Sequence, residues 1–215
     1  MNDTLVAFAS KQEFSGVFPH LTATVATTSP YSIDNRFDVC VCGVGMVEFS
    51  ANLAYFLAKG GYKRVVQVGI CGVYPNRDFQ VGEVVRVDAD ALGDMGVQTR
   101  EGHFVPWHDV YGEKLVYSGE SPRALSLALA SIPSAVGVTV SCCTGTRYLA
   151  LRRGGMFKAD VETMEGAACF AVCKRFGVPA YQFRAISNVA TDRDTSTWKV
   201  PEALAALKSQ VLDVL

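Results

Sequence analysis

The sequence lacks the features that mark several common classes of protein. No apolar run approaches the ~18 residues that a membrane-spanning helix needs, so no membrane segment is expected. The 20 basic and 21 acidic residues give a net charge of -1 without a basic cluster, which argues against a nucleic-acid partner. The first ten residues contain Asp3 and no basic segment, unlike a secretory signal. We therefore expect a cytoplasmic protein whose partner is a small molecule.

Patterns that bind metals are also missing. The sequence has seven cysteines, an odd number, and none of them forms a CxxC pair. A zinc site requires Cys and His ligands at short, regular spacing, and His20, His103 and His108 do not supply it. We expect no metal site and reduced, mostly buried cysteines.

Apolar runs of strand length alternate with longer amphipathic segments. The pattern predicts strands over 4–9, 38–44, 64–68, 83–87, 136–141 and 180–186. It predicts helices over 46–59, 121–131, 165–176 and 201–215, with a loop-like segment over 92–118. This alternation indicates an α/β fold in one domain, residues 1–215: a three-layer α/β/α sandwich around a mixed, largely parallel twisted sheet.

Several expected loops follow strands, where ligands bind in such sheets. They cover residues 9–13, 69–72, 141–146 and 187–194. The glycine loop consists of Gly69, Ile70, Cys71 and Gly72; it either approaches a ligand with its backbone or is simply a tight turn. Gly43-Val44-Gly45 resembles the start of a dinucleotide fingerprint, but no third glycine follows, so NAD is not expected.

Two motifs in the second half of the chain carry a more specific signal. Met164-Glu165-Gly166-Ala167-Ala168 is followed further on by Arg184-Ala185-Ile186-Ser187-Asn188. Taken alone, Glu165 is sufficiently explained as a carboxylate that complements the dipole of the helix it starts. Together, however, the motifs resemble the signature of the purine nucleosidase/phosphorylase superfamily. The resemblance implies a nucleoside phosphorylase-like fold, a nucleoside substrate and a homodimer or larger homo-oligomer.

The resemblance also implies roles for four side chains. Glu165 would accept a hydrogen bond from the ribose 2′-hydroxyl, and Met164 would pack under the sugar. Glu13 would position the attacking water, and Asn188 would meet the N7 edge of the purine. These roles suit the chemistry, because N-glycosidic cleavage passes through an oxocarbenium-like state that a carboxylate stabilises.

The nucleophile is indicated by Gln67 and Ile70. Hexameric phosphorylases of the superfamily carry arginine and serine or threonine there, and both side chains hold phosphate. An amide and an isoleucine do not provide such ligands, so water is the expected nucleophile.

Asn188 bears on the identity of the base. Nucleosidases that act on adenine nucleosides usually carry aspartate at this position. The Asn188 amide can donate to N7 and O6 of a 6-oxopurine, although its carbonyl could also face the amino group of adenine. An amide cannot release a proton as an acid does, so the general acid stays open, with Asp192 and Asp194 as nearby candidates.

Further segments resemble the futalosine hydrolases within the superfamily. The matching segments are Thr144-Gly145-Thr146, then Asp192-Arg193-Asp194 with Trp198. We assign a role in binding the base or the 5′ tail to Thr144, Gly145, Thr146, Asp194 and Trp198. The aromatic rings of Trp198, Phe104 and Trp107 could enclose an aromatic tail.

The resemblance thus implies an N-glycosidase that hydrolyses futalosine to hypoxanthine and dehypoxanthinyl futalosine, in the futalosine route to menaquinone, without a cofactor. Two alternatives stay open. One is a methylthioadenosine/adenosylhomocysteine-type nucleosidase. The other is a non-catalytic nucleoside-binding protein, against which the pair Glu13 and Glu165 argues.

Overall fold

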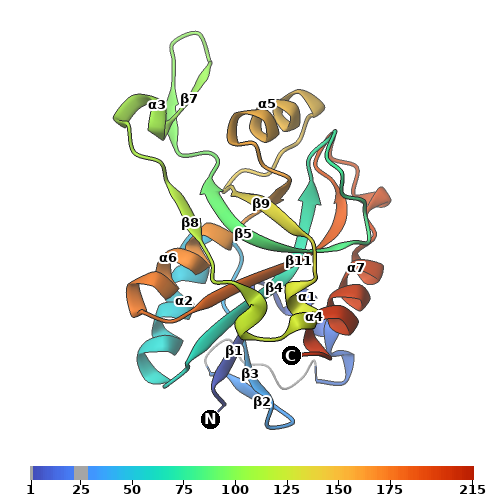
Figure 1. The fold of residues 1–215 in the computed structure, drawn as a ribbon. Helices are drawn as coiled ribbons and strands as arrows, with labels where there is room; N and C mark the ends of the chain where they lie inside the picture. Colours follow the sequence, from blue (N-terminus) through green and yellow to red (C-terminus); the bar gives the residue numbers. More distant parts are fainter. Residues whose placement is uncertain (1, 22–28) are drawn as a thin grey trace.

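The computed structural model describes residues 2–21 and 29–215 and has a central sheet covered by helices on both faces (Figure 1). One half of this sheet is parallel, in the order β3 (Phe37–Val41), β1 (Thr4–Phe8), β4 (Arg64–Val73) and β11 (Ala180–Val189). The short β2 (Tyr31–Ile33) pairs antiparallel with β3 at the edge. The predicted α/β sandwich with a mixed sheet is confirmed.

The other half of the sheet closes on itself. β5 (Val84–Leu92) pairs antiparallel with β11 and parallel with β9 (Ser134–Thr139). β10 (Val161–Thr163) pairs with β9 and also, antiparallel, with the end of β4. The strands β4, β11, β5, β9 and β10 therefore form a closed ring, and the end of β4 has a paired strand on each side.

The remaining strands lie outside this ring. β8 (Val116–Ser118) pairs with β5, and β6 (Gly96–Gln98) pairs with β7 (Phe104–Pro106) as a separate hairpin. The hairpin and α3 (Trp107–Tyr111) project from the body of the protein (Figure 1).

The helices cover the sheet in two groups. α2 (Met46–Lys59) and α6 (Gly166–Phe176) pack on one face, where Leu53 and Phe170 share a buried cluster. α1 (Lys11–Val17), α4 (Leu127–Ala130) and α7 (Val200–Leu207) cover the other face. α5 (Arg147–Phe157) lies beside the ring. Within residues 2–21 and 29–215, no helix is long and apolar enough to cross a membrane.

The structure corrects three of the expected loops. Residues 9–13 do not form a loop, because α1 begins after Ser10. Gly69–Gly72 belongs to β4, because β11 pairs with β4 as far as Val73 and gives the backbone of this segment its partners. β11 likewise extends to Val189, with a register shift between Ile186 and Asn188.

Other boundaries also differ from the sequence pattern. The helix predicted over 121–131 divides into a 3₁₀ turn, Pro122–Ala124, and α4, which Ser126 caps anew. The final helix ends in a π-helical turn, Lys208–Leu212. α5 and β10 were not predicted, and the expected loop over 92–118 contains β6, β7, α3 and β8.

The cysteines agree with the sequence prediction. All seven are free, and five of them are buried. Cys40, Cys42, Cys169 and Cys173 belong to the apolar core between the sheet and the pair α2 and α6.

Candidate active site

A pocket of about 440 Å³ opens where several strands end. Its wall contains residues that follow β1, β3, β9 and β10 together with the ends of β4 and β11, the usual ligand position in such sheets. Of the predicted site residues, the pocket is lined by Glu13, Ile70, Cys71, Gly72, Thr144, Met164, Glu165, Asn188 and Trp198.

Glu13 is held by the start of α1. Ser10 and Glu13 form a capping box, in which the Ser10 backbone N–H and hydroxyl donate to Glu13 Oε2, both at 3.0 Å. The Ile70 backbone N–H donates to Glu13 Oε1 at 2.9 Å. A carboxylate has about four acceptor positions, so these three donors leave one for a further ligand. Glu13 is thus both a helix-capping residue and a fixed acceptor at the pocket wall.

Glu165 is buried and faces the same pocket from the start of α6. Its Oε1 accepts from the Gly45 backbone N–H at 2.9 Å, and its Oε2 lies 3.6 Å from Arg184 Nη2. Burial raises the pKa of Glu165 above its ordinary value, while Arg184 and the Gly45 N–H oppose this shift. The charges of Glu13 and Asp90 raise the pKa of Glu165 further.

The free backbone N–H groups in the first turn of α6 donate to side chains other than Glu165. Thr163 Oγ1 accepts from the Gly166 N–H at 3.3 Å, and Thr139 Oγ1 accepts from the Ala167 N–H at 2.8 Å. The Glu165 carboxylate is directed to Gly45 and Arg184 instead. The helix-dipole interpretation therefore does not explain its orientation.

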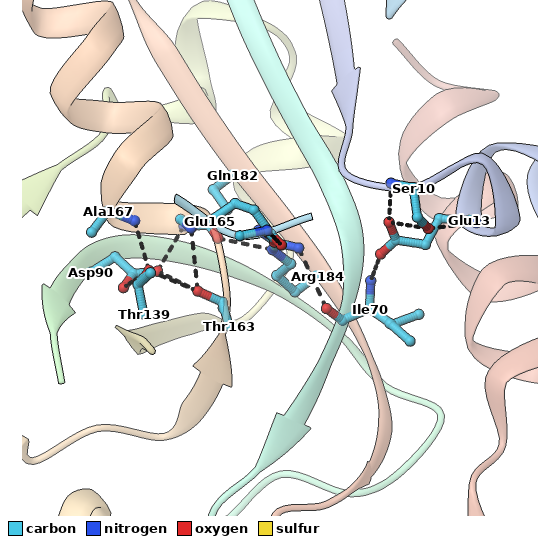
Figure 2. Close-up of polar contacts among 12 residues, drawn as sticks. Ser10, Glu13, Ile70, Asp90, Thr139, Thr163, Glu165, Ala167, Gln182 and Arg184 are labelled. Carbon is cyan, nitrogen blue, oxygen red and sulfur yellow. Dashed lines mark hydrogen bonds and ion pairs between the residues drawn. The ribbon is translucent and has the colours of Figure 1, made fainter. Parts of the chain in front are cut away.

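Arg184, on β11, connects the groups of the site beneath the pocket (Figure 2). It is 1% exposed. Its Nε donates to Gln182 Oε1 at 2.9 Å, its Nη1 donates to the Ile70 carbonyl at 3.4 Å, and its Nη2 faces Glu165. Arg184 belonged to a recognised sequence motif but had no assigned role; the structure makes it the cation beside Glu165.

Gly69 leaves the space in which Glu13 and Arg184 approach each other. A Cβ atom at Gly69 would lie 2.6 Å from Glu13 Oε1 and 2.7 Å from Arg184 Nη1. Gly69 therefore lies beneath the pocket, where its lack of a side chain permits a close approach rather than a turn.

A fully buried carboxyl group, Asp90, extends this network. It accepts from Thr139 Oγ1 at 2.8 Å, Thr163 Oγ1 at 3.2 Å and Gln182 Nε2 at 3.3 Å. Burial raises the pKa of Asp90, and the three donors lower it. Asp90 and Gln182 carry no sequence signal of their own, because each acts only through neighbours from other strands.

The Asn188 amide has a defined orientation. The Val189 carbonyl, which can only accept, lies 3.1 Å from Asn188 Nδ2, so the amide nitrogen must face it. Asn188 Oδ1 then accepts from the Ser187 hydroxyl at 2.8 Å. One N–H of the amide remains for a ligand, and Asn188 is therefore a donor at the pocket wall.

A second acidic network lines the pocket at Glu162. The Thr144 backbone N–H donates to Glu162 Oε1 at 2.7 Å. Glu162 Oε2 accepts from the Thr144 hydroxyl and from Tyr74 OH, and lies 3.4 Å from Arg153 Nη1. Burial, with the charge and hydrogen bond of Glu162, raises the pKa of Tyr74 far above its ordinary value. Of this set, Thr144 was predicted as a site residue, whereas Glu162, Tyr74 and Arg153 were missed, although Glu162 lies next to a recognised motif.

Besides Gly69, three predicted residues lie away from the pocket lining. Gly145 is exposed, and Thr146 caps α5 by accepting from the Leu149 N–H at 3.2 Å. Asp194 accepts from the Ser196 hydroxyl at 2.6 Å and from the Ser196 N–H at 3.0 Å, and it caps the 3₁₀ turn Thr195–Thr197. These two hydrogen bonds lower the pKa of Asp194.

The aromatic candidates separate in the same way. Trp198 lines the pocket, and the Arg193 guanidinium carbon lies 5.2 Å from its ring centre. Phe104 and Trp107 line other cavities, beside α5. Trp198 is therefore the aromatic residue of the three that the fold places at the pocket.

The charges of the pocket suit a cationic transition state better than a phosphate ion. Among the described lining residues, Glu13, Glu162 and Glu165 are acidic, and Arg193 alone is basic. Gln67 is fully buried in β4, and its amide atoms have no hydrogen-bond partner in residues 2–21 and 29–215. Neither Gln67 nor Ile70 supplies a positive charge, so a phosphate ion would meet mainly carboxylates.

Comparison with known proteins identifies the superfamily to which this fold and site belong. Residues 33–215 match the family model of the phosphorylase superfamily. The chain therefore belongs to this superfamily.

Individual relatives identify the family within this superfamily to which the chain belongs. The chain is 32% identical to a futalosine hydrolase from Streptomyces coelicolor, over 84% of this chain and 79% of that protein. It is 30% identical to a futalosine hydrolase from Thermus thermophilus, over 80% of this chain and 78% of that protein. Within the superfamily, the chain belongs to the futalosine hydrolase family.

A solved structure supports the same fold. The futalosine hydrolase mutant of Helicobacter pylori superposes with a TM-score of 0.74 over 99% of this chain and 100% of that one, at 19% identity.

Proposed function

We propose that the protein is an N-glycosidase that hydrolyses futalosine to hypoxanthine and dehypoxanthinyl futalosine, in the futalosine route to menaquinone. The observation that carries the proposal is the arrangement of Glu13 and Glu165 in one pocket, each held by backbone N–H donors and both close to Arg184. The futalosine hydrolases among its relatives support the choice of substrate.

Glu165 acts on the sugar. Its carboxylate accepts a hydrogen bond from the ribose 2′-hydroxyl, while Met164 packs under the ring. As the bond from C1′ to N9 lengthens, positive charge develops on the sugar, and the negative charge of Glu165 stabilises it. Arg184 favours the ionised form of Glu165, because its charge opposes the effect of burial on the pKa.

Glu13 acts on water. Its free acceptor position holds one hydrogen of the water molecule and directs the oxygen at C1′. The new bond forms between this oxygen and C1′, and the electron pair of the broken bond goes to N9 of the base. Glu13 takes the proton that the water releases.

Asn188 acts on the leaving base. Its remaining N–H donates to N7 or O6 and stabilises the negative charge of the departing 6-oxopurine. Because an amide has no acidic proton, the base takes its proton from solvent. Phosphate has no dedicated ligand among the lining residues, and hydrolysis requires no cofactor.

We further propose a cytoplasmic homodimer or larger homo-oligomer that binds neither nucleic acid nor membranes. The net charge of -1 supports the choice of a small-molecule partner. Val47, 81% exposed on α2, and Tyr148, 69% exposed on α5, provide apolar surface for contact with a second copy. Light scattering after size-exclusion chromatography measures the mass; a monomer at working concentrations would contradict this assembly.

The substrate assignment is tested by measuring the free base that the purified protein releases. Futalosine, methylthioadenosine, adenosylhomocysteine and inosine are offered separately in phosphate-free buffer, and the bases are separated by liquid chromatography. The expected result is hypoxanthine from futalosine and little base from the others. Adenine from the two thio-nucleosides, with none from futalosine, would contradict the proposal.

A further inference from the structure

Gly72 lies between two polar side chains of the pocket. In the pairing of β10 with β4, Glu162 is the register partner of Gly72. In the pairing of β11 with β4, Asn188 is the partner of the same glycine. Glu162 and Asn188 both line the pocket, and Gly72 places no side chain between them. The fold thus sets an acceptor and a donor on opposite sides of the Gly72 backbone.

The acceptor is Glu162 Oε1. Glu162 Oε2 is surrounded by the Thr144 hydroxyl, Tyr74 OH and the Arg153 guanidinium. Glu162 Oε1 has one donor, the Thr144 backbone N–H at 2.7 Å, and so keeps a lone pair for a ligand. All these neighbours donate to the carboxyl oxygens, so Glu162 presents Oε1 to a ligand as an acceptor.

The two candidate bases, hypoxanthine and adenine, present the same acceptor at N7 but opposite patterns at position 6 and at N1. Along one edge, hypoxanthine has acceptors at N7 and O6 and a donor at N1–H. Adenine has an acceptor at N7, a donor at its 6-amino group and an acceptor at N1. A donor from Asn188 and an acceptor from Glu162 match hypoxanthine at both ends, whereas adenine would set N1 against a carboxylate.

We propose that Glu162 is a specificity-determining residue that accepts a hydrogen bond from N1–H of a 6-oxopurine, while Asn188 donates to O6 or N7 of the same base. This inference rests on the proposed function, since it concerns the base that the reaction releases. It places the selection of hypoxanthine over adenine on two side chains from β10 and β11.

Glu162→Gln tests this role with a defined change of polarity. Three donors hold Oε2 and only the Thr144 N–H holds Oε1, so the glutamine carbonyl stays at the Oε2 position. The amide NH₂ then takes the place of Oε1 and faces the pocket, and the hydrogen bond from the Thr144 N–H is lost. The variant then repels N1–H and donates to N1 of adenine. Tyr74→Phe is the matched control, because it removes one donor of the network and leaves the carboxylate in place.

The measurement is calorimetric binding of hypoxanthine, adenine and 1-deazahypoxanthine, which has a C–H group in place of N1–H. The wild type is expected to bind hypoxanthine about tenfold or more tightly than the 1-deaza analogue, the effect of one hydrogen bond to a charged group. Glu162→Gln should lose this preference and shift the hypoxanthine-to-adenine ratio by at least about tenfold toward adenine. Tyr74→Phe should keep the wild-type ratios.

Equal binding of hypoxanthine and its 1-deaza analogue by the wild type would overturn the inference, whether or not Glu162→Gln folds. An unchanged hypoxanthine-to-adenine affinity ratio in a folded Glu162→Gln protein would also overturn it. So would an equal loss of affinity for all three bases in both variants, because a purely structural role of Glu162 gives that result. Cleavage of futalosine is scored separately. N1–H preference without cleavage would refute the proposed function alone, and cleavage without N1–H preference would refute this inference alone.

Discussion

The inner and outer walls of the pocket are built differently. The inner wall, defined as Glu13, Glu162, Glu165 and Asn188 with Arg184 behind them, comes from strands and the first residues of helices. The outer wall, defined as residues 145–146 and 192–198, comes from connecting segments that are largely exposed. On the inner wall every predicted residue lines the pocket, while on the outer wall Gly145, Thr146 and Asp194 do not.

The difference shows what fixes a side chain in this fold. Strand register places Glu162 and Asn188 on either side of Gly72 and brings Arg184 below Glu165. Outer-wall side chains are used first for local turns, as Thr146 and Asp194 are. Inner-wall substitutions should therefore affect chemistry or folding strongly, and outer-wall substitutions should affect only the affinity for the tail.

The largest effect is expected for Glu13→Gln. Because the variant cannot take a proton from water, kcat should fall by roughly 10³-fold while substrate binding persists. Ser10→Ala is the control, since it removes the capping box and leaves the carboxylate. It should cost about 1 kcal/mol of stability and much less activity. Equal losses of kcat in the two variants would show that Glu13 acts only as a helix-capping residue.

Gly166→Ala should destabilise the protein, because the added methyl group overlaps side chains packed beneath the inner wall. A Cβ at Gly166 would overlap Asp90 Oδ2 and lie 2.5 Å from Gln182 Oε1. We expect a loss of about 3 kcal/mol in the free energy of unfolding, measured by denaturant titration. A Cβ at Gly155, in α5, would have no described atom within 4 Å, so Gly155→Ala should be neutral or stabilise by up to about 1 kcal/mol. Similar values for the two variants would contradict the close packing of α6.

The raised pKa of Glu165 should set activity and stability against each other. A carboxyl whose folded pKa lies above its ordinary value of 4.5 contributes stability that is full below that pH. The contribution is lost as pH rises through the folded pKa. Catalysis needs the ionised form, so kcat/KM should fall over the same window as pH decreases.

Glu165→Gln removes this titration and allows the two effects to be compared. The Tm of the wild type minus that of the variant should decrease as pH rises through the folded pKa. Thermal unfolding at a series of pH values gives the difference directly. A difference independent of pH would show that Glu165 is not perturbed by its burial.

The smallest effects should come from the outer wall. Trp198→Ala should raise KM for futalosine by about tenfold, through loss of a ring that contacts the tail, and leave the kcat/KM for inosine nearly unchanged. Asp194→Asn retains an acceptor for the Ser196 N–H and should change kcat/KM by less than about twofold. A large fall in kcat for either variant would show that the outer wall takes part in the chemistry.

The sequence alone predicted a helix correctly where one segment contains both the apolar spacing and the residues that end the helix. The helix Met46–Lys59 was predicted with its observed bounds, because its apolar spacing ends at Gly60-Gly61. α1 was missed although Ser10 and Glu13 have the spacing of a capping box, because only seven residues follow the cap. α5 contains Arg152, Arg153 and two glycines, so no apolar face identifies it.

For the site, the resemblance to a known family located residues at the starts of helices and at the end of a strand. Glu13, Glu165 and Asn188 were predicted as site residues and all line the pocket; their roles remain predictions. Arg184 and Glu162 were given no role, because their importance depends on pairing with strands that are distant in sequence. Pairing of β10 with both β9 and β4 is a tertiary property that no local pattern contains.

The central claim is that water, held by Glu13, attacks the sugar of futalosine. The most direct test is mass spectrometry of the products of futalosine cleavage, with the initial rate measured over a series of phosphate concentrations. Attack by water yields hypoxanthine and the free sugar, dehypoxanthinyl futalosine, at a rate that phosphate does not change. A sugar 1-phosphate product, or a rate that requires phosphate, would contradict it.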